Sequence, residues 1–433
     1  MYIKDILKIG GKMRRPLLGV FVILIFLTFI YTEKKPLEGS FDNEVVIIEG
    51  IVENKIEKKV YDEYEVDKFL VRDYTRRKKL EIGDKLSIQG KFKSLDKMKY
   101  EDFDYGRYIK SRGYNGIIYI QKYDIIGSNF IYRYLGNIKV YLRETYRYLY
   151  KNNSDFINSI LLGEKENLTD EEKDMFQRTG TSHIIAISGL HTGILCVLIT
   201  FVIGGINRFY KLVVLFIFIF LYCMMVSGSP SIVRSIAFIT VLYLSVFFDK
   251  KRDGMSTLSL IGTFLVLDNP YIIYSISFQL SFLSTMSIIY FYTYINNIIK
   301  VKLISVTLSA NILTLPIMYY NFKGISLISI ISNMIVVPFI GIIIYLSIVS
   351  VMLFKINIEI SKFVAYLNKT IINSIYFLLN KTSDLNFAYV EIEEPCKYYV
   401  FIYYILIFLY MIYKELSVIK EQENGLQGYY KEY

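Results

Sequence analysis

The chain has 433 residues, of which 53% are hydrophobic and 16% aromatic, and its formal net charge is +10. Its charged residues crowd into residues 33–180 and the C-terminal end, and apolar runs of about 20 residues lie between them, which excludes an ordinary soluble globular protein. Three cysteines and two histidines form no cluster with metal-ligand spacing, so no cofactor or metal is expected.

The chain begins with a basic segment followed by an apolar one. Residues 1–15 carry five Lys or Arg and one Asp, and residues 16–31 read PLLGVFVILIFLTFIY. No cleavage site with small residues follows, so the pattern predicts an uncleaved transmembrane anchor over residues 1–32 with its N-terminus in the cytoplasm.

Residues 33–128 have a different character. Short β-branched runs at 44–53, 67–74, 85–93 and 116–126 are bounded by glycine and charge. This pattern predicts a small extracytoplasmic β-rich domain, and the glycine turn before 85–93 is typical of five-stranded barrels such as OB-folds. No cysteine lies in this segment, so its own core must hold it together.

Residues 129–182 are predicted to be amphipathic helices at the membrane interface, because they combine basic residues with many tyrosines. Thr169 followed three residues later by Glu172 predicts a helix start with a capping box. Gly180 predicts the end of the same helix.

Residues 183–415 are predicted to form a transmembrane bundle, followed by a cytoplasmic tail over 416–433. Together with the anchor, the apolar runs give about ten transmembrane helices, some of them broken. If the N-terminus lies inside, the basic loops 207–211, 249–253 and 296–302 all fall on the cytoplasmic side, as the positive-inside rule demands. The expected spans are 184–204, 212–227, 231–248, 255–268, 271–294, 302–320, 325–354, 361–380 and 398–413.

Polar residues within these apolar runs are candidates for a translocation pathway, because such residues are costly in a bilayer unless they face a bundle interior or a wet path. Helix packing is the alternative role for each of them. Pro316 and Pro338 predict broken helices. The candidates are Ser188, Gly189, His191, Arg234, Gln279, Asn311 and Asn333.

The acidic residues missing from the bundle narrow the choice of substrate. No Asp or Glu occurs from His183 to Phe248, which suits an anion better than a cation or a proton-coupled solute. Ser188 and His191 are helical neighbours, but no GxSxG turn and no acid accompany them, so a hydrolase is not favoured. No phosphate-binding GxxxxGK[ST] loop is present to supply energy.

Four ordered blocks of the sequence carry a resemblance to a known family. The string HIIAISGLHTG (183–193) resembles the signature of the ComEC-type competence family of DNA-uptake channels. Residues 227–238, 269–285 and 314–338 resemble the family's later blocks in the expected order, namely SGSPSIVRSIAF, NPYIIYSISFQLSFLST and TLPIMYYNFKGISLISIISNMIVVP. Residues 103–120 are similar to the end of its OB-like domain.

The resemblance implies a channel without chemistry of its own that carries single-stranded DNA into the cytoplasm across the bacterial plasma membrane. The implied partners are membrane lipid, a cytoplasmic ATP-driven DNA translocase, a surface DNA receptor and other copies of the chain. Many members carry a C-terminal metallo-β-lactamase-like domain that this sequence lacks, so degradation of the second strand is expected to need another protein. An anion or solute transporter and a non-transporting scaffold of a competence apparatus remain alternatives.

A basic run near the middle of the β-rich segment is the candidate DNA-binding patch. OB-like domains combine a basic groove with aromatic side chains on which bases stack. A solvated charge run is the alternative interpretation. The candidate residues are Arg72, Tyr74, Arg76, Arg77, Lys78 and Lys79.

Overall fold

The computed structural model describes residues 16–35, 37, 41–76, 80–100, 104–226, 237 and 253–431. Three of the expected DNA-binding residues, Arg77, Lys78 and Lys79, lie outside the described residues. So do the pathway candidate Arg234 and the expected span 231–248.

Five strands near the N-terminus close into a small barrel in the order β1-β2-β3-β5-β4. Only β3 and β5 pair in parallel. Alternating residues point inward, as Leu86 and Ile88 of β4 do, which gives the barrel its core. The strands are β1 (Val45–Glu57), β2 (Asp62–Val66), β3 (Phe69–Asp73), β4 (Asp84–Lys93) and β5 (Gly116–Ser128).

The predicted five-stranded barrel is therefore confirmed, whereas its OB-like character stays a prediction. One short helix, α3 (Tyr105–Ser111), lies between β4 and β5. It packs against one end of the barrel in a second small apolar cluster that includes Leu70, Ile109 and Ile117.

Three helices follow the barrel: α4 (Phe130–Tyr150), α5 (Ser154–Leu162) and α6 (Asp170–Arg178). The predicted capping box at the start of α6 is confirmed, because the side chains of Thr169 and Glu172 each accept from the other's backbone N–H. The predicted helix end is confirmed as well, since Gly180 follows the C-cap with φ of 69°. The placement of these helices at a membrane interface stays a prediction.

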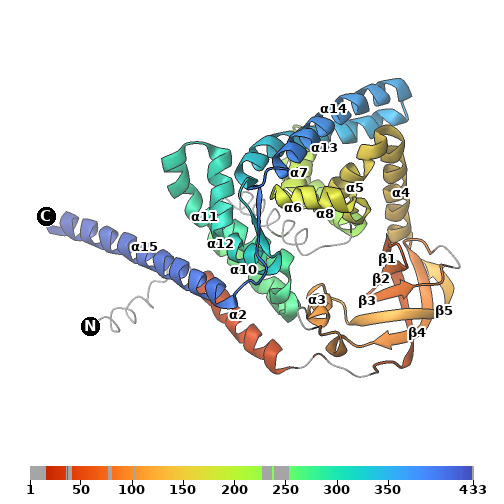
Figure 1. The fold of residues 1–433 in the computed structure, drawn as a ribbon, viewed down its shortest axis with the longest axis horizontal. Coiled ribbons are helices and arrows are strands. Elements are labelled where there is room, and N and C mark those ends of the chain that lie inside the picture. Colours follow the sequence, from red (N-terminus) through yellow and green to blue (C-terminus); the bar gives the residue numbers. More distant parts are fainter. Residues whose placement is uncertain are drawn as a thin grey trace.

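Apart from α3, the helices pack around two separate apolar cores. We call the helices around each core the first and the second helix group (Figure 1). The first group contains α4, α5, α6, α7 (Gly189–Ile203), α8 (Arg208–Val226), α13 (Ser329–Phe354) and α14 (Ile358–Ser383). The second group contains α2 (Pro16–Lys34), α10 (Gly254–Asp268), α11 (Ile276–Ile299), α12 (Lys302–Asn321) and α15 (Lys397–Lys431).

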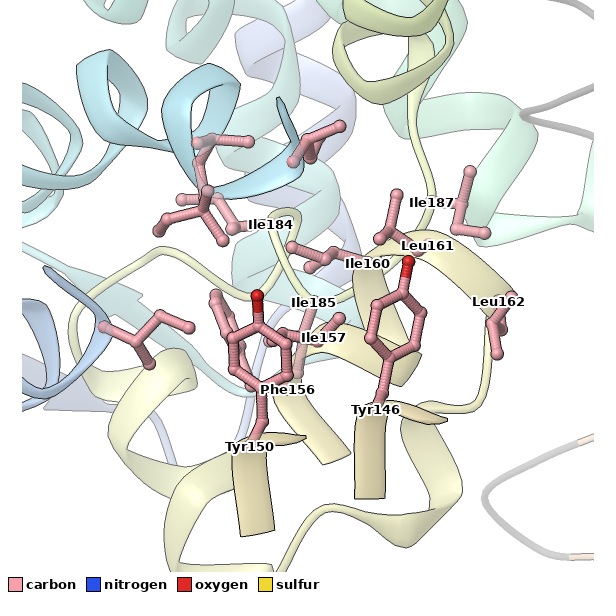
Figure 2. Close-up of a cluster of buried hydrophobic side chains, with 14 of the residues drawn as sticks. Tyr146, Tyr150, Phe156, Ile157, Ile160, Leu161, Leu162, Ile184, Ile185 and Ile187 are labelled. Atoms are coloured by element: carbon pink, nitrogen blue, oxygen red, sulfur yellow. The ribbon is translucent and has the colours of Figure 1, made fainter. Parts of the chain in front are cut away.

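Figure 2 shows the centre of the first group, where Tyr146 and Tyr150 of α4 lie beside the isoleucines of α5. Ile184 and Ile185, which precede α7, pack against the same cluster. The segment that resembles the family signature is thus anchored by apolar burial next to α4 and α5.

In the described part of the chain, five helices are long and apolar enough to cross a membrane: α2, α8, α12, α13 and the first half of α15. The helices α7 and α10 are apolar but shorter, at 15 residues each. A membrane protein follows from these lengths. The total of about ten spans and the orientation of the chain stay predictions.

Several expected boundaries were wrong. The span predicted to begin at residue 184 begins as a helix only at Gly189, because Ser188 serves as the N-cap. The span predicted from residue 325 begins at Ser329, because residues 324–326 form β6 and pair with β7 (Tyr389–Glu391). Helix α15 continues to Lys431, but its apolar part, Lys397–Lys414, agrees with the expected span 398–413, and the cytoplasmic tail over 416–433 stays a prediction.

The expectation that proline breaks helices was also wrong at two positions. Pro316 lies inside α12 and Pro338 inside α13, and both helices continue through them. Packing against neighbouring helices offsets the lost backbone donor. The interruptions occur instead before α7 and before α11, where a 3-10 turn covers Pro270–Tyr274.

Candidate functional site

The barrel is attached to the first helix group through α4, which starts directly after β5. Asn129 caps this helix by accepting from the N–H groups of Ile131 and Tyr132. Tyr132 then donates to Glu53 of β1 at 3.1 Å, and Arg133 pairs with Asp84 of β4. The first turns of α4 are therefore fixed to the barrel wall.

The barrel is attached to the second helix group through α3. Asn269, which precedes the 3-10 turn, donates to the carbonyl of Lys110 at 2.9 Å. Arg107 pairs with Glu33 at the end of α2 at 2.6 Å and lies over the ring of Tyr274. One small barrel thus bridges the two helix groups, as Figure 1 shows.

A cavity of about 810 Å³ lies where the barrel and the two helix groups meet, and we call it the vestibule. Its walls come from the β1–β2 hairpin, α3, α4, the loop 163–167 and two short segments, 185–187 and 275–277. The segment 185–187 leads directly into Ser188, and 275–277 leads into α11. Two of the signature blocks, 183–193 and 269–285, therefore contribute residues to the wall of this cavity.

Basic and acidic side chains line the vestibule in equal number, so it is not a simple basic groove. Most of its cations already hold a carboxylate, as Arg112 holds Glu65 at 3.3 Å and Lys58 holds Glu63 at 2.9 Å. The charged lining residues are Lys55, Lys58, Arg112, Lys139, Arg143, Arg147 and Lys165, with Glu57, Glu63, Glu65, Glu81, Glu144, Glu164 and Glu166.

The loop between α5 and α6 is fixed by a glycine. Gly163 ends α5 in the left-handed conformation with φ of 77°, and a Cβ there would lie 2.8 Å from Cγ1 of Val226. The turn directs the next residue, Glu164, back toward α4, where its carboxylate meets Arg143. This glycine therefore sets the position of one wall of the vestibule.

We expect Gly163→Ala to destabilise the folded chain by about 1–2 kcal/mol from left-handed backbone strain, with a further loss from the contact with Val226. Thermal unfolding of the purified chain in detergent measures the change. Gly113→Ala is the matched control, because φ there is 94° but no atom lies within 4 Å of an added Cβ. Equal losses in the two variants would contradict a role for the Val226 contact.

The first turn of α7 brings Ser188, Gly189 and His191 together. The backbone N–H of Ser188 donates to Nδ1 of His191 at 3.2 Å, and Oγ of Ser188 lies 2.9 Å from the same nitrogen. Because Nδ1 accepts, a neutral imidazole carries its proton on Nε2. His191 is buried, and its Nε2 has no hydrogen-bond partner among the described residues. A buried donor without an acceptor is costly and marks a candidate contact for water or for a passing anion.

The other pathway candidates are divided between the helix groups. Asn333 is buried on α13, and its Oδ1 has no partner within the described ranges. Gln279 of α11 donates to the carbonyl of Ile273 at 2.7 Å, which holds the 3-10 turn. Asn311 is half-buried on α12. No hydrogen bond between described residues joins Gln279 or Asn311 to His191.

Two of the six expected DNA-binding residues, Arg72 and Arg76, are engaged with acids. Arg72 contacts Glu63 at 3.0 Å and donates to Tyr105 at 2.8 Å, and Arg76 lies 3.3 Å from Asp62. Arg72 faces Glu63 because β2 and β3 are adjacent antiparallel strands, whereas Arg76 follows the end of β3. Neither arginine is a free cation in this structure.

Tyr74 belongs instead to an aromatic cluster with Tyr61 and Tyr119, which we call the tyrosine patch. The ring of Tyr74 lies 4.9 Å from Tyr61 and 6.1 Å from Tyr119, centroid to centroid, and half of its surface is exposed. Arg72 lies over Tyr61 at 5.0 Å and reaches Tyr105, which lines the vestibule. The patch therefore adjoins the vestibule.

Sequence reasoning missed Tyr61 and Tyr119, because only barrel closure brings them beside Tyr74. It also missed Lys139 and Arg143 of α4, although their spacing of four residues places them on one helix face and is visible in the sequence. Among the described residues no group of three or more His, Cys, Asp or Glu could hold a metal ion.

Comparison with known proteins agrees with the resemblance that the signature blocks carry. The model of a family described as "Competence protein" matches residues 160–417. The chain is 28% identical over 291 residues to ComE operon protein 3 of Bacillus subtilis (strain 168), which covers 66% of this chain and 37% of that protein. It is 28% identical over 159 residues to an uncharacterized protein of Aquifex aeolicus (strain VF5), covering 35% of this chain and 37% of the relative. The chain thus matches little more than a third of the length of either relative, and no solved structure matches it.

Proposed function

The chain belongs to the competence protein family, and we propose that it is a membrane channel through which single-stranded DNA enters the cytoplasm. The vestibule carries this proposal. It lies between the barrel and both helix groups, and two of the signature blocks contribute residues to its wall. Its volume is at the upper end of the range for sites that hold a small ligand, which suits a short stretch of single strand.

In this proposal the barrel is an OB-like domain on the outer side of the membrane. Exposed rings of the tyrosine patch stack with bases irrespective of sequence, as an uptake channel requires. The strand then enters the vestibule and passes the first turn of α7 and the other polar candidates. A surface receptor delivers the DNA, and a cytoplasmic ATP-driven translocase pulls it, with the channel itself performing no catalysis.

The balanced charge of the vestibule fits the transport of a polyanion better than its tight binding. A conduit must hold its cargo strongly enough for entry and weakly enough for release. Cations that already hold carboxylates exchange partners with phosphates at small net gain, whereas bare cations would trap a polyanion. The equal number of basic and acidic lining residues fits this requirement.

Entry of labelled DNA into the cytoplasm of the source bacterium tests the proposal, with the gene deleted and then restored. Loss of entry with intact surface binding of DNA supports the channel. Unchanged entry after deletion would remove the main support for a DNA channel and favour an anion or solute transporter. A scaffold without a transport role predicts that point variants in the vestibule behave like the wild type as long as protein levels are normal.

His191 offers a prediction that separates helix capping from a role in the pathway. Glutamine is a usual partner in capping boxes, so His191→Gln retains an acceptor for the Ser188 N–H but removes the imidazole ring and the position of its Nε2 donor. We expect His191→Ala to lower the stability of the folded chain by about 1–3 kcal/mol, because the buried N–H of Ser188 loses its acceptor. We expect His191→Gln to restore most of that stability and of the protein yield. We expect DNA entry to be lost in both variants. Normal entry with His191→Gln would reduce His191 to a cap.

A further inference from the structure

Two cations on α4 share a single carboxylate at the wall of the vestibule. Arg143 holds Glu164 with its planar fork, since Nε lies 2.8 Å from Oε2 and 3.0 Å from Oε1 while a terminal nitrogen also contacts Oε1. Lys139, one helical turn earlier, has its Nζ 3.9 Å from the same Oε1. The three side chains line the vestibule, and two cations with one carboxylate give them a net charge of +1.

Lys139 is unusually buried for a lysine, with 3% of its surface exposed. Its ammonium has three donors, and the one hydrogen bond seen for it is a long one, 3.4 Å to Oδ1 of Asn54 on β1. Burial lowers the pKa of Lys139, which Glu164 only partly opposes. A buried ammonium with so little compensation is stabilised by a further anionic oxygen.

The Glu164 carboxylate can leave the two cations by rotation of its side chain, while the loop backbone stays fixed by Gly163 and by the hydrogen bond from the Glu164 N–H to the carbonyl of Asn158. Its side chain is mostly covered, with 13% exposed, and among the described residues its ion pairs are with Lys139 and Arg143. Its neighbours on the loop, Lys165 and Glu166, are exposed. This carboxylate can therefore be displaced by another oxyanion that enters the vestibule.

We propose that Lys139 and Arg143 form a phosphate-binding site in the vestibule wall, which Glu164 fills when no phosphate is present. A guanidinium fork donates hydrogen bonds to two oxygens of a phosphate as readily as to the two oxygens of a carboxylate. When a phosphate displaces the Glu164 carboxylate, one anion replaces another at the two cations. The site therefore holds its ligand transiently. The identification of the ligand as the DNA backbone rests on the proposed function, whereas the chemistry of the site requires only a phosphate group.

Binding of a labelled oligothymidylate to the purified full chain in detergent, measured across salt concentrations, tests the site. Glu164→Gln leaves both cations free and is expected to tighten binding about threefold to tenfold. Each cation released to a phosphate steepens the slope of log affinity against log salt by about 0.7 for a single strand. The double variant Lys139→Gln/Arg143→Gln is expected to flatten that slope by about 1.4.

Glu166→Gln is the matched control, because it makes the same change of charge on an exposed residue of the same loop. Equal affinity and slope in Glu164→Gln and Glu166→Gln would overturn the site. So would a loss of thermal stability in Glu164→Gln without tighter binding, since a purely structural ion pair predicts that result.

A second arm with inorganic tripolyphosphate separates this site from the proposed function. Tripolyphosphate binding that tightens in Glu164→Gln, with no binding of DNA by any variant, keeps the phosphate site and removes DNA as its ligand. DNA entry that depends on the gene in cells, with oligothymidylate binding indifferent to Glu164, keeps the channel and removes the site.

Discussion

A cysteine placed at position 186 and modified with a bulky thiol reagent is expected to stop DNA entry. Ala186 lines the vestibule two residues before Ser188, so an adduct there projects into the space that the strand would occupy. We expect entry to fall by about tenfold or more, because a conduit of this size conducts little once it is constricted. Labelled DNA entering cells that carry Ala186→Cys, before and after treatment, measures the effect.

The background for this experiment lacks the free cysteines Cys196, Cys223 and Cys396. A cysteine at Val390 is the control, because that side chain is 45% exposed on β7 and does not line the vestibule. The sequence-based topology places it on the same side of the membrane as the barrel, so the same impermeant reagent reaches it. Normal entry after complete modification of residue 186 would show that the strand takes another route.

Tyr74→Ala is expected to weaken the binding of single-stranded DNA by about 1–3 kcal/mol for each base that loses its stacking partner, or about 5- to 150-fold. Tyr74 is the most exposed ring of the tyrosine patch, and its removal leaves the barrel core untouched. Equilibrium binding of a labelled oligonucleotide to the purified chain measures the loss.

Tyr74→Phe keeps the ring and should bind like the wild type. Arg76→Gln should have a smaller effect, since Arg76 is already paired with Asp62. Arg72 is a poor probe, because its contacts with Glu63 and Tyr105 also stabilise the barrel. A Tyr74→Ala chain that folds normally and binds with wild-type affinity would exclude the tyrosine patch as a DNA-binding surface.

Local signals in the sequence predicted local structure well. Thr169, Glu172 and Gly180 identified α6, because caps depend on side chains within four residues of one another. The alternating runs identified β1, β3, β4 and β5 for the same reason, whereas β2 was missed. The signature blocks from residue 183 onward identified the family that the comparison reports.

Expectations that depended on partners distant in the sequence fared worse. Hydropathy placed residues 184 and 325 at the start of membrane helices, but a side-chain cap at Ser188 and strand pairing with β7 shift both helix starts. Composition indicated a basic patch that includes Arg72 and Arg76, whereas Glu63, the cross-strand neighbour of Arg72, and Asp62 form ion pairs with these two arginines. Hydropathy and composition do not contain these pairings.

The sequence by itself determined the class of protein, four strands of the barrel, the two ends of α6 and the family, because apolar period, caps and short motifs are properties of adjacent residues. Only the tertiary structure decided which polar groups meet. Barrel closure assembles Tyr61, Tyr74 and Tyr119, and the turn at Gly163 sets Glu164 against Lys139 and Arg143. The barrel bridges two helix groups and thereby encloses the vestibule, since burial of two separate apolar cores leaves the polar surface between them as its wall.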